Sequence, residues 1–369
     1  MKRIILVSII VGIICCKSVY ANEFESNTYI TLDDFDLKET QNVMQREKYS
    51  IDIDELLQEI SKGNVMAAVN IIIDNVRDKL ENQFNDIKQV IITIIFTTVF
   101  AALIVNFSYS SSKNGVNEMA FYACYVLQIS TLMYIFQIAM EIGEKLVLFI
   151  LQLMGAIIPT YLLAVGITSQ ATALGFNSLI MTLIAVIEAV ILNIVFPMLK
   201  VYMAISMVNS ISKEDLLSGM ADLIKKAINF IYKIILGNLI QSLILPTTDL
   251  AKNNIAKKII SNVPIVGNGT DAVAQIILSS VGIIKNSIGV LAIILIVFVC
   301  IVPMVKMTAY SAVVQISGAV LQPIADKRIL NCIKQTSEGI KLLNRGISVV
   351  GFLFIITIAI ICISTGNGG

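Results

Sequence analysis

The chain has 369 residues, of which 56% are hydrophobic and only 14% are charged, and its mean hydropathy is +0.83. Because an average soluble domain carries about 25% charged residues, this composition predicts an all-α protein that crosses a membrane several times. A net charge of +1 provides no basic field for nucleic acid. The lack of histidine excludes His-based zinc sites and Ser-His-Asp or Cys-His catalysis, and the six cysteines show no CxxC spacing. We expect no catalytic residues, no metal and no cofactor.

The N-terminus has the order of a secretory signal peptide. Two cations, Lys2 and Arg3, precede an apolar run that ends at Cys16, and a small-residue pattern ending at Ala21 offers a cleavage site. We therefore predict a signal peptide over residues 1–21 and a mature chain that starts outside the cytoplasm. An uncleaved anchor is the alternative.

Residues 22–88 form the only long polar stretch of the sequence. We predict that they are an extracytoplasmic segment that is partly helical. A set of apolar residues at helical spacing indicates one short amphipathic helix. These residues are Ile51, Ile53, Leu56, Leu57 and Ile60. The acidic cluster at 33–36 lacks the glycine and the terminal glutamate of a calcium loop, so we interpret it as a solvated face or a partner contact.

Residues 89–369 are predicted to be a multi-span helical membrane domain, because a crossing needs about 20 mostly apolar residues. Seven segments meet this requirement clearly, and an eighth is weaker because it contains polar residues. The seven are Val90–Phe107, Met119–Met140, Leu146–Ile167, Ser178–Phe196, Ser287–Val305, Met307–Ala325 and Gly346–Ser364, and the eighth is Ile228–Leu245.

The segment Asp326–Arg345 carries five cations and is expected to be a cytoplasmic loop. Seven crossings would separate this loop from an N-terminus outside the cell, so we favour a bundle of about eight spans with both ends outside. If Val201–Met207 and Asp271–Ile284 also cross, the same sidedness holds with ten spans.

Two near-copies of one motif, 106 residues apart, favour an internal duplication: Pro197-Met198-Leu199-Lys200 and Pro303-Met304-Val305-Lys306. Proline removes a backbone donor, and lysine is costly in hydrocarbon. We expect each motif near the outer end of its span, where a lysine side chain can reach the interface.

Glu188 is the one acidic residue well inside a strong predicted span. An ionised carboxylate at that depth costs about 2.5 to 3.5 kcal/mol, so a partner or a proton is expected. Lys200 and Lys306 are the candidate partners. One interpretation is a proton or ion relay, or the polar lining of a pore; the other is a structural ion pair that fixes how the two copies dock.

Two further elements are expected between the motifs. Residues Ser212–Ile231 have the spacing of an amphipathic helix at the interface, with Lys225 and Lys226 opposite its apolar face. Farther on, Gly267, Gly269 and Asp271 belong to a turn that could lead a re-entrant element into the bilayer. Since no nucleotide-binding motif is present in the sequence, energy for any transport would come from elsewhere.

Three segments of the C-terminal half resemble the stage III sporulation protein AE family. They are Asn262–Val273 (NVPIVGNGTDAV), Ile284–Gly289 (IKNSIG) and Leu321–Asp326 (LQPIAD). The order of a signal sequence, an acidic extracytoplasmic segment and many spans agrees with this resemblance. The family motifs identify membership and carry no catalytic residue.

The resemblance implies a non-enzymatic component of the secretion channel complex in the mother-cell membrane, which links mother cell to forespore and sustains the forespore after engulfment. It also implies partners, namely a cytoplasmic ATPase and ring-forming proteins of the intermembrane space. The alternative from the residues themselves is a secondary transporter or permease for a small solute, because transporters are often built from repeats with polar groups at mid-membrane.

Overall fold

The computed structural model of the chain describes residues 35, 37–47, 49, 51–110, 114–168, 170–211, 216–237, 270–323 and 325–366. Throughout these ranges the regular elements are helices and no strand occurs, so the predicted all-α class is confirmed. The predicted signal peptide (1–21) and the turn that contains Gly267 and Gly269 lie outside the described residues.

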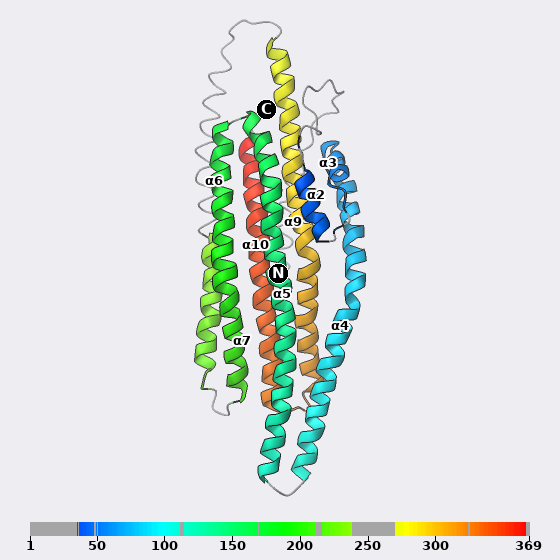
Figure 1. Cartoon of the computed structure of the whole chain (residues 1–369), viewed down its shortest axis with the longest axis vertical. Coiled ribbons are helices and arrows are strands. Elements are labelled where there is room, and N and C mark those ends of the chain that lie inside the picture. Colours follow the sequence, from blue (N-terminus) through cyan, green and yellow to red (C-terminus); the bar gives the residue numbers. More distant parts are fainter. Residues whose placement is uncertain are drawn as a thin grey trace.

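Long helices run up and down one common axis (Figure 1). The described helices, both long and short, are in chain order α2 (Lys38–Arg46), α3 (Ile53–Ser61), α4 (Val65–Ser110), α5 (Asn114–Thr168), α6 (Gln170–Val186), the π-helix η2 (Ile187–Val195), α7 (Phe196–Ile211), a helix over 218–237, α9 (Thr270–Leu321) and α10 (Lys327–Gly366).

Four helical stretches of the described chain are long and apolar enough to cross a membrane. They are Tyr122–Ile167, Ala173–Ser210, Gly282–Leu321 and Lys327–Cys362, with 46, 38, 40 and 36 residues. About 20 residues suffice for one crossing. The structure therefore supports a membrane protein, but the count of about eight spans is not confirmed.

The lower number has two causes. Neither Val90–Phe107 nor Ile228–Leu245, of which only 228–237 is described, is among the four stretches, and two pairs of predicted spans are each joined in one helix. Met119–Met140 and Leu146–Ile167 both lie in α5, and Ser287–Val305 and Met307–Ala325 are joined in α9, which continues to Leu321. The charged residues between the members of each pair are Glu and Lys, which are strong helix formers. They interrupt the hydrophobic pattern without ending the helix.

The segment 326–345, which we expected to be a loop, is instead the first half of α10. Asp326 explains its start, since its Oδ1 accepts a hydrogen bond from the backbone N–H of Arg328 at 2.8 Å and so satisfies a free donor of the first turn. The five cations are thus carried on a helix.

α10 is the centre of the bundle, because α9, α7 and α5 all pack against it. It separates the two Pro-Met-x-Lys motifs, one of which lies on α7 and the other on α9 (Figure 1). Glycines on α10 allow close approach: a Cβ at Gly346 would lie 2.9 Å from Cζ of Tyr232, and one at Gly339 would lie 3.1 Å from Cε2 of Phe136. Small residues have this role at helix contacts in membranes.

The N-terminal hairpin, defined as α2, α3 and the residues between them (37–61), packs against α5 and α9. Its connection is held by Gln41, which donates to the carbonyl of Ile51 at 2.8 Å and accepts from the N–H of Ile53 at 2.9 Å. Asp52 caps α3 by accepting from the backbone N–H groups of Asp54 and Glu55. The predicted amphipathic helix is confirmed, since all its apolar residues are buried.

Candidate functional site

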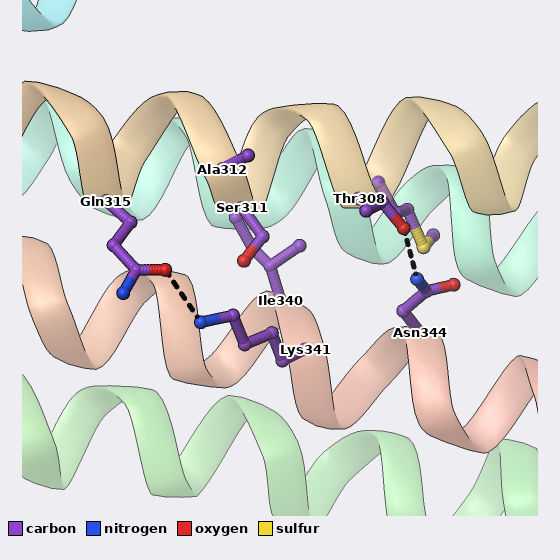
Figure 2. Close-up of a pocket in the computed structure, with 8 residues that line it drawn as sticks. Thr308, Ser311, Ala312, Gln315, Ile340, Lys341 and Asn344 are labelled. Carbon is purple, nitrogen blue, oxygen red and sulfur yellow. Dashed lines mark hydrogen bonds between the residues drawn. The ribbon is translucent and has the colours of Figure 1, made fainter. Parts of the chain in front are cut away.

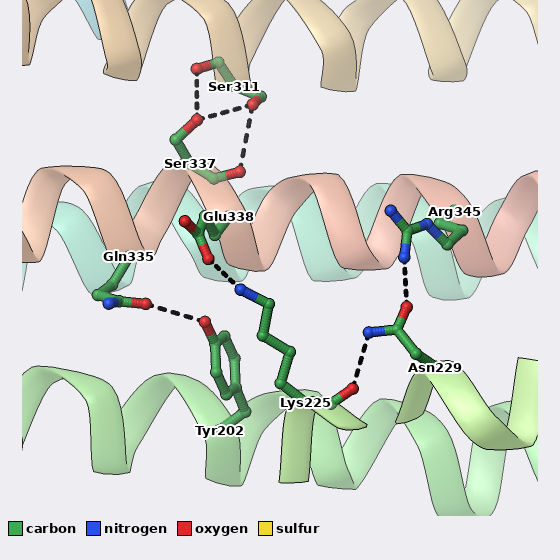
Figure 3. A network of polar contacts seen from close by, with 8 residues as sticks. All are labelled: Tyr202, Lys225, Asn229, Ser311, Gln335, Ser337, Glu338 and Arg345. Atoms are coloured by element: carbon green, nitrogen blue, oxygen red, sulfur yellow. Dashed lines mark hydrogen bonds and ion pairs between the residues drawn. The ribbon is translucent and has the colours of Figure 1, made fainter. Parts of the chain in front are cut away.

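The polar residues in the first half of α10 lie on two faces of the helix, at steps of three, four or seven residues. One face carries Asn331, Gln335, Glu338 and Arg345, and the other carries Ser337, Lys341 and Asn344. We call the contacts of both faces the polar seam. The first face meets α7 and the helix over 218–237, and the second meets α9 (Figure 3).

On the first face, ion pairing and hydrogen bonding join three helices (Figure 3). The hydroxyl of Tyr202 on α7 donates to Oε1 of Gln335 at 2.9 Å. Lys225 Nζ pairs with the carboxylate of Glu338, and the guanidinium of Arg345 donates to Oδ1 of Asn229. These contacts fix the position of the helix over 218–237 relative to α10.

The ion pair is partly open to the surroundings, because the side chains of Lys225 and Glu338 are 34% and 29% exposed. Solvent therefore weakens the attraction between the two charges.

The helix over 218–237 buries only part of the face that its spacing suggested, in which Ile224 and Ile231 are partly buried. The buried side carries Ala221, Ile228 and Tyr232 together with the partly buried Lys225, whereas Leu216 and Leu223 are 73% and 67% exposed. We expected Lys225 opposite the apolar face. The prediction was wrong because Glu338 of α10, more than 100 residues away in sequence, draws the ammonium group into the interface.

On the second face, α9 and α10 exchange hydrogen bonds (Figure 2 and Figure 3). The hydroxyls of Ser311 and Ser337 lie 2.9 Å apart, and each also donates to the other's backbone carbonyl. Asn344 Nδ2 donates to the hydroxyl of Thr308 at 2.9 Å, and Lys341 donates to Oε1 of Gln315 at 2.9 Å.

A pocket of about 100 Å³ lies along this face. It is lined by Met307, Thr308, Ser311, Ala312, Gln315, Ile340, Lys341 and Asn344 (Figure 2). Binding pockets for small molecules usually have about 300 to 1,000 Å³, so this one is too small for a typical substrate. The seam therefore serves to hold helices together.

The first motif lies where the helix changes its winding. Pro197 has no N–H to donate, and its ring crowds the carbonyl four residues earlier. Immediately before it the helix widens into η2, in which the N–H of Phe196 bonds to the carbonyl of Ile191, five residues back. The predicted site residue Glu188 lies in this π-helix, where its side chain is exposed.

Lys200 pairs with Glu144 of α5, at 2.9 Å between Nζ and Oε1. Neither of the candidate partners is paired with Glu188 by any contact among the described residues. The structure thus brings the first motif to α5, a contact that the sequence analysis missed. The sequence feature that could have indicated this partner is Glu144, which lies with Glu141 and Lys145 between two apolar runs.

The second motif lies inside α9, which passes Pro303 without a π-helical segment. The Nζ atom of Lys306 lies 5.8 Å from the ring centroid of Tyr310, in a cation–π contact. Asp271 belongs to the first turn of α9, so Asp271–Ile284 continues directly into the long helix. The re-entrant element remains a prediction.

Other polar contacts in the bundle are also between helices. The hydroxyl of Tyr125 donates to the carbonyl of Met207 at 2.9 Å and lies 3.1 Å from Sγ of Cys332. Across the described residues, no group of three Cys, Asp or Glu side chains is placed to hold a metal ion. These polar contacts orient the helices relative to one another.

Comparison with known proteins identifies the family. A family model described as stage III sporulation protein AE matches residues 51–365, from the start of α3 nearly to the end of α10. A relative from Bacillus subtilis (strain 168), named stage III sporulation protein AE, is 23% identical over 283 residues, which are 74% of this chain and 70% of the relative. No solved structure matches the chain. The match covers the polar seam and four apolar helices of membrane-spanning length, and the chain belongs to the stage III sporulation protein AE family.

Proposed function

We propose that this protein is a non-enzymatic, multi-pass component of the sporulation channel complex that links mother cell and forespore, and that the forespore needs it after engulfment. The observation that carries the proposal is the family match over residues 51–365. The polar seam supports a structural role, since its contacts join helices and surround a pocket too small for a substrate.

The proposed location is the mother-cell membrane around the forespore. The partners are the other proteins of the stage III sporulation A complex, including the cytoplasmic ATPase and the ring-forming proteins of the intermembrane space. These finer assignments come from the family resemblance. The ATPase would supply the energy for transport, since the sequence of this chain contains no nucleotide-binding motif.

For the topology we propose a cleaved signal peptide over 1–21, an extracytoplasmic segment over 22–88 and a membrane domain over 89–369. The described residues contain six helical passes, whose directions alternate along the long axis (Figure 1). They are α4, α5, α6 with η2 and α7, the helix over 218–237, α9 and α10. Five passes precede the α9–α10 connection, so an N-terminus outside the cell again puts the basic start of α10 in the cytoplasm.

Six passes thus keep the sidedness that we predicted with eight spans. An eight-span arrangement requires a reversal near Gly143 in α5 and another near Lys306 in α9. Cysteines placed at these two positions, tested with membrane-impermeant thiol reagents from each side, separate the two counts. Eight spans put both positions on the side opposite the α9–α10 connection, where the reagent should label them, whereas six passes leave both in the middle of a crossing helix. Absence of labelling from either side would therefore contradict eight spans, and labelling of both from the side opposite the α9–α10 connection would contradict six passes.

The function is tested by deleting the gene in its own spore-forming host. We expect normal vegetative growth, normal engulfment and a loss of heat-resistant spores, with a block in forespore gene expression after engulfment. Expression of the intact gene from a second locus should restore spore formation. Normal numbers of heat-resistant spores from the deletion strain would contradict the proposal.

A secondary transporter is the second candidate, and the position of Glu188 favours it. π-Helical segments occur frequently at functional sites, and this carboxylate is exposed within one in an apolar helix. The purified protein in liposomes would then carry a small solute, and Glu188→Gln would abolish the flux. Flux that is equal in both proteins would eliminate Glu188 as the transport residue.

A further inference from the structure

We infer that the bundle has two unlike sides at one level of its long axis: the side of the N-terminal hairpin faces a water-filled passage, and the side of α6 faces lipid. This inference rests on the proposed function for the identity of the passage. Its physical basis is the way in which the hairpin and α6 expose opposite kinds of side chain.

The hairpin is docked on helices that the sequence places in the membrane. The ring of Tyr49 stacks on Phe149 of α5 at 5.5 Å between centroids and meets Phe298 of α9 edge-on at 5.0 Å. Phe149 and Phe298 both lie within segments apolar enough to span a bilayer. The hairpin therefore covers bundle surface that lipid would otherwise cover.

The inner face of the hairpin is apolar and tightly buried. Met44, Ile53, Leu56 and Ile60 are all completely buried. Burial of such side chains is favourable only when the alternative is water, because hydrocarbon is as apolar as the protein interior. Docking by this face therefore indicates that the hairpin is surrounded by water.

The outer face of the hairpin is charged, which leads to the same conclusion. Eight ionisable side chains of its described residues and the turn after it are exposed. They are Lys38, Glu39, Arg46, Glu47, Asp52, Asp54, Glu55 and Lys62. The first turns of α4 extend this polar surface with Asp74 and Arg77, which are also exposed. Charged groups in contact with hydrocarbon carry a large cost, so lipid cannot cover this side.

α6 lies on the opposite side of the bundle from the hairpin, at the same level of the long axis (Figure 1). Its surface is apolar there, since Leu174 and Met181 are 66% and 46% exposed. If this level lay outside the bilayer, these side chains would face water on all sides. If lipid surrounded it completely, the charges of the hairpin would face hydrocarbon. A two-sided environment satisfies both surfaces.

The inference is tested by spin labelling of the full chain in liposomes, starting from a variant without its six cysteines. Nitroxides are placed on the hairpin side by Asp54→Cys and Gln58→Cys, and on the α6 side by Leu174→Cys and Met181→Cys. All four positions are surface positions, so the labels need no repacking of the core. Collision with oxygen reports lipid, and collision with a water-soluble nickel chelate reports water.

We expect the ratio of nickel to oxygen accessibility to be several-fold higher at the two hairpin positions than at the two α6-side positions. Nickel access at all four positions would overturn the inference, because this level would then lie outside the bilayer. Oxygen access without nickel access at all four would overturn it as well. Protection of the hairpin positions from both reagents would also overturn the inference, because another protein surface and not water would then cover the hairpin. None of these outcomes depends on whether the deletion strain forms spores, which tests the function separately.

Discussion

The N-terminal hairpin and the polar seam are built in opposite ways. The hairpin places apolar side chains inside and charges outside, as a soluble protein does. Around the seam, hydrogen bonds and an ion pair lie between the helices, while large apolar side chains such as Leu223, Phe230 and Ile316 point outward. The hairpin therefore suits an aqueous environment, and the polar seam suits a lipid environment.

The physical reason is that water and lipid favour different contacts. In water, apolar burial is worth about 25 cal/mol per Å² and drives the hairpin onto α5 and α9. In lipid this driving force between helices is absent, so close packing at small residues and interhelical hydrogen bonds take its place. The two regions of this chain follow these two rules within one bundle.

The largest effect is expected from Ile60→Asp, which puts a carboxylate at a completely buried position of the hairpin. Leaving an uncompensated charge buried costs about 3 to 5 kcal/mol, so the hairpin should detach from α5 and α9. Hydrogen exchange of residues 37–61 should rise strongly while that of α10 stays unchanged. The control Gln58→Asp adds the same group at an exposed position of α3 and should have little effect. Equal exchange in both variants would show that apolar burial does not hold the hairpin.

A smaller loss is expected from Gly346→Ala, which tests close packing in the bundle. The added Cβ would lie 2.9 Å from Cζ of Tyr232, and overpacking of this kind costs about 1 to 3 kcal/mol. Thermal unfolding in detergent should show a lower midpoint, and Tyr232→Phe should restore part of it by removing the nearest atom. Gly155→Ala on α5 meets nothing within 4 Å and should be neutral or slightly stabilising. A lower midpoint for both alanine variants would contradict the packing argument.

The smallest effect is expected from the ion pair of the seam. A double-mutant cycle with Lys225→Met and Glu338→Gln should give a coupling of about 0.5 to 1 kcal/mol, because both side chains are about one-third exposed and solvent weakens the interaction. A coupling near zero would remove the ion pair from the contacts that orient the helix over 218–237.

Much of the architecture was predictable from the residues. Composition indicated an all-helical membrane protein, and the spacing of Ile53, Leu56 and Ile60 predicted α3, because an amphipathic period of 3.6 residues is local information. The number of spans could not be predicted in this way. Charges such as Glu144 and Lys306 divide an apolar run into two span-length parts, but they favour helix, and hydropathy alone does not distinguish a turn from a charged helical turn.

The site was predictable only in part. The residues of both faces of α10 repeat at helical spacing and could have been found once 326–345 was treated as a helix. Their partners could not, because Tyr202, Lys225 and Ser311 come from three other helices. The π-helix before Pro197 could not be predicted from that proline, since Pro159 in α5 and Pro303 in α9 have no such segment before them.

The helical class, the membrane environment and the family follow from composition, local periodicity and motifs, which can be read from the residues alone. Which charges meet, where the N-terminal hairpin docks and which side of the bundle is polar become known only from the folded structure. These features depend on contacts between helices that are far apart in the chain. A side chain such as Lys225 has the same local sequence whether it faces solvent or Glu338, and only the packing of α10 against its neighbours distinguishes the two.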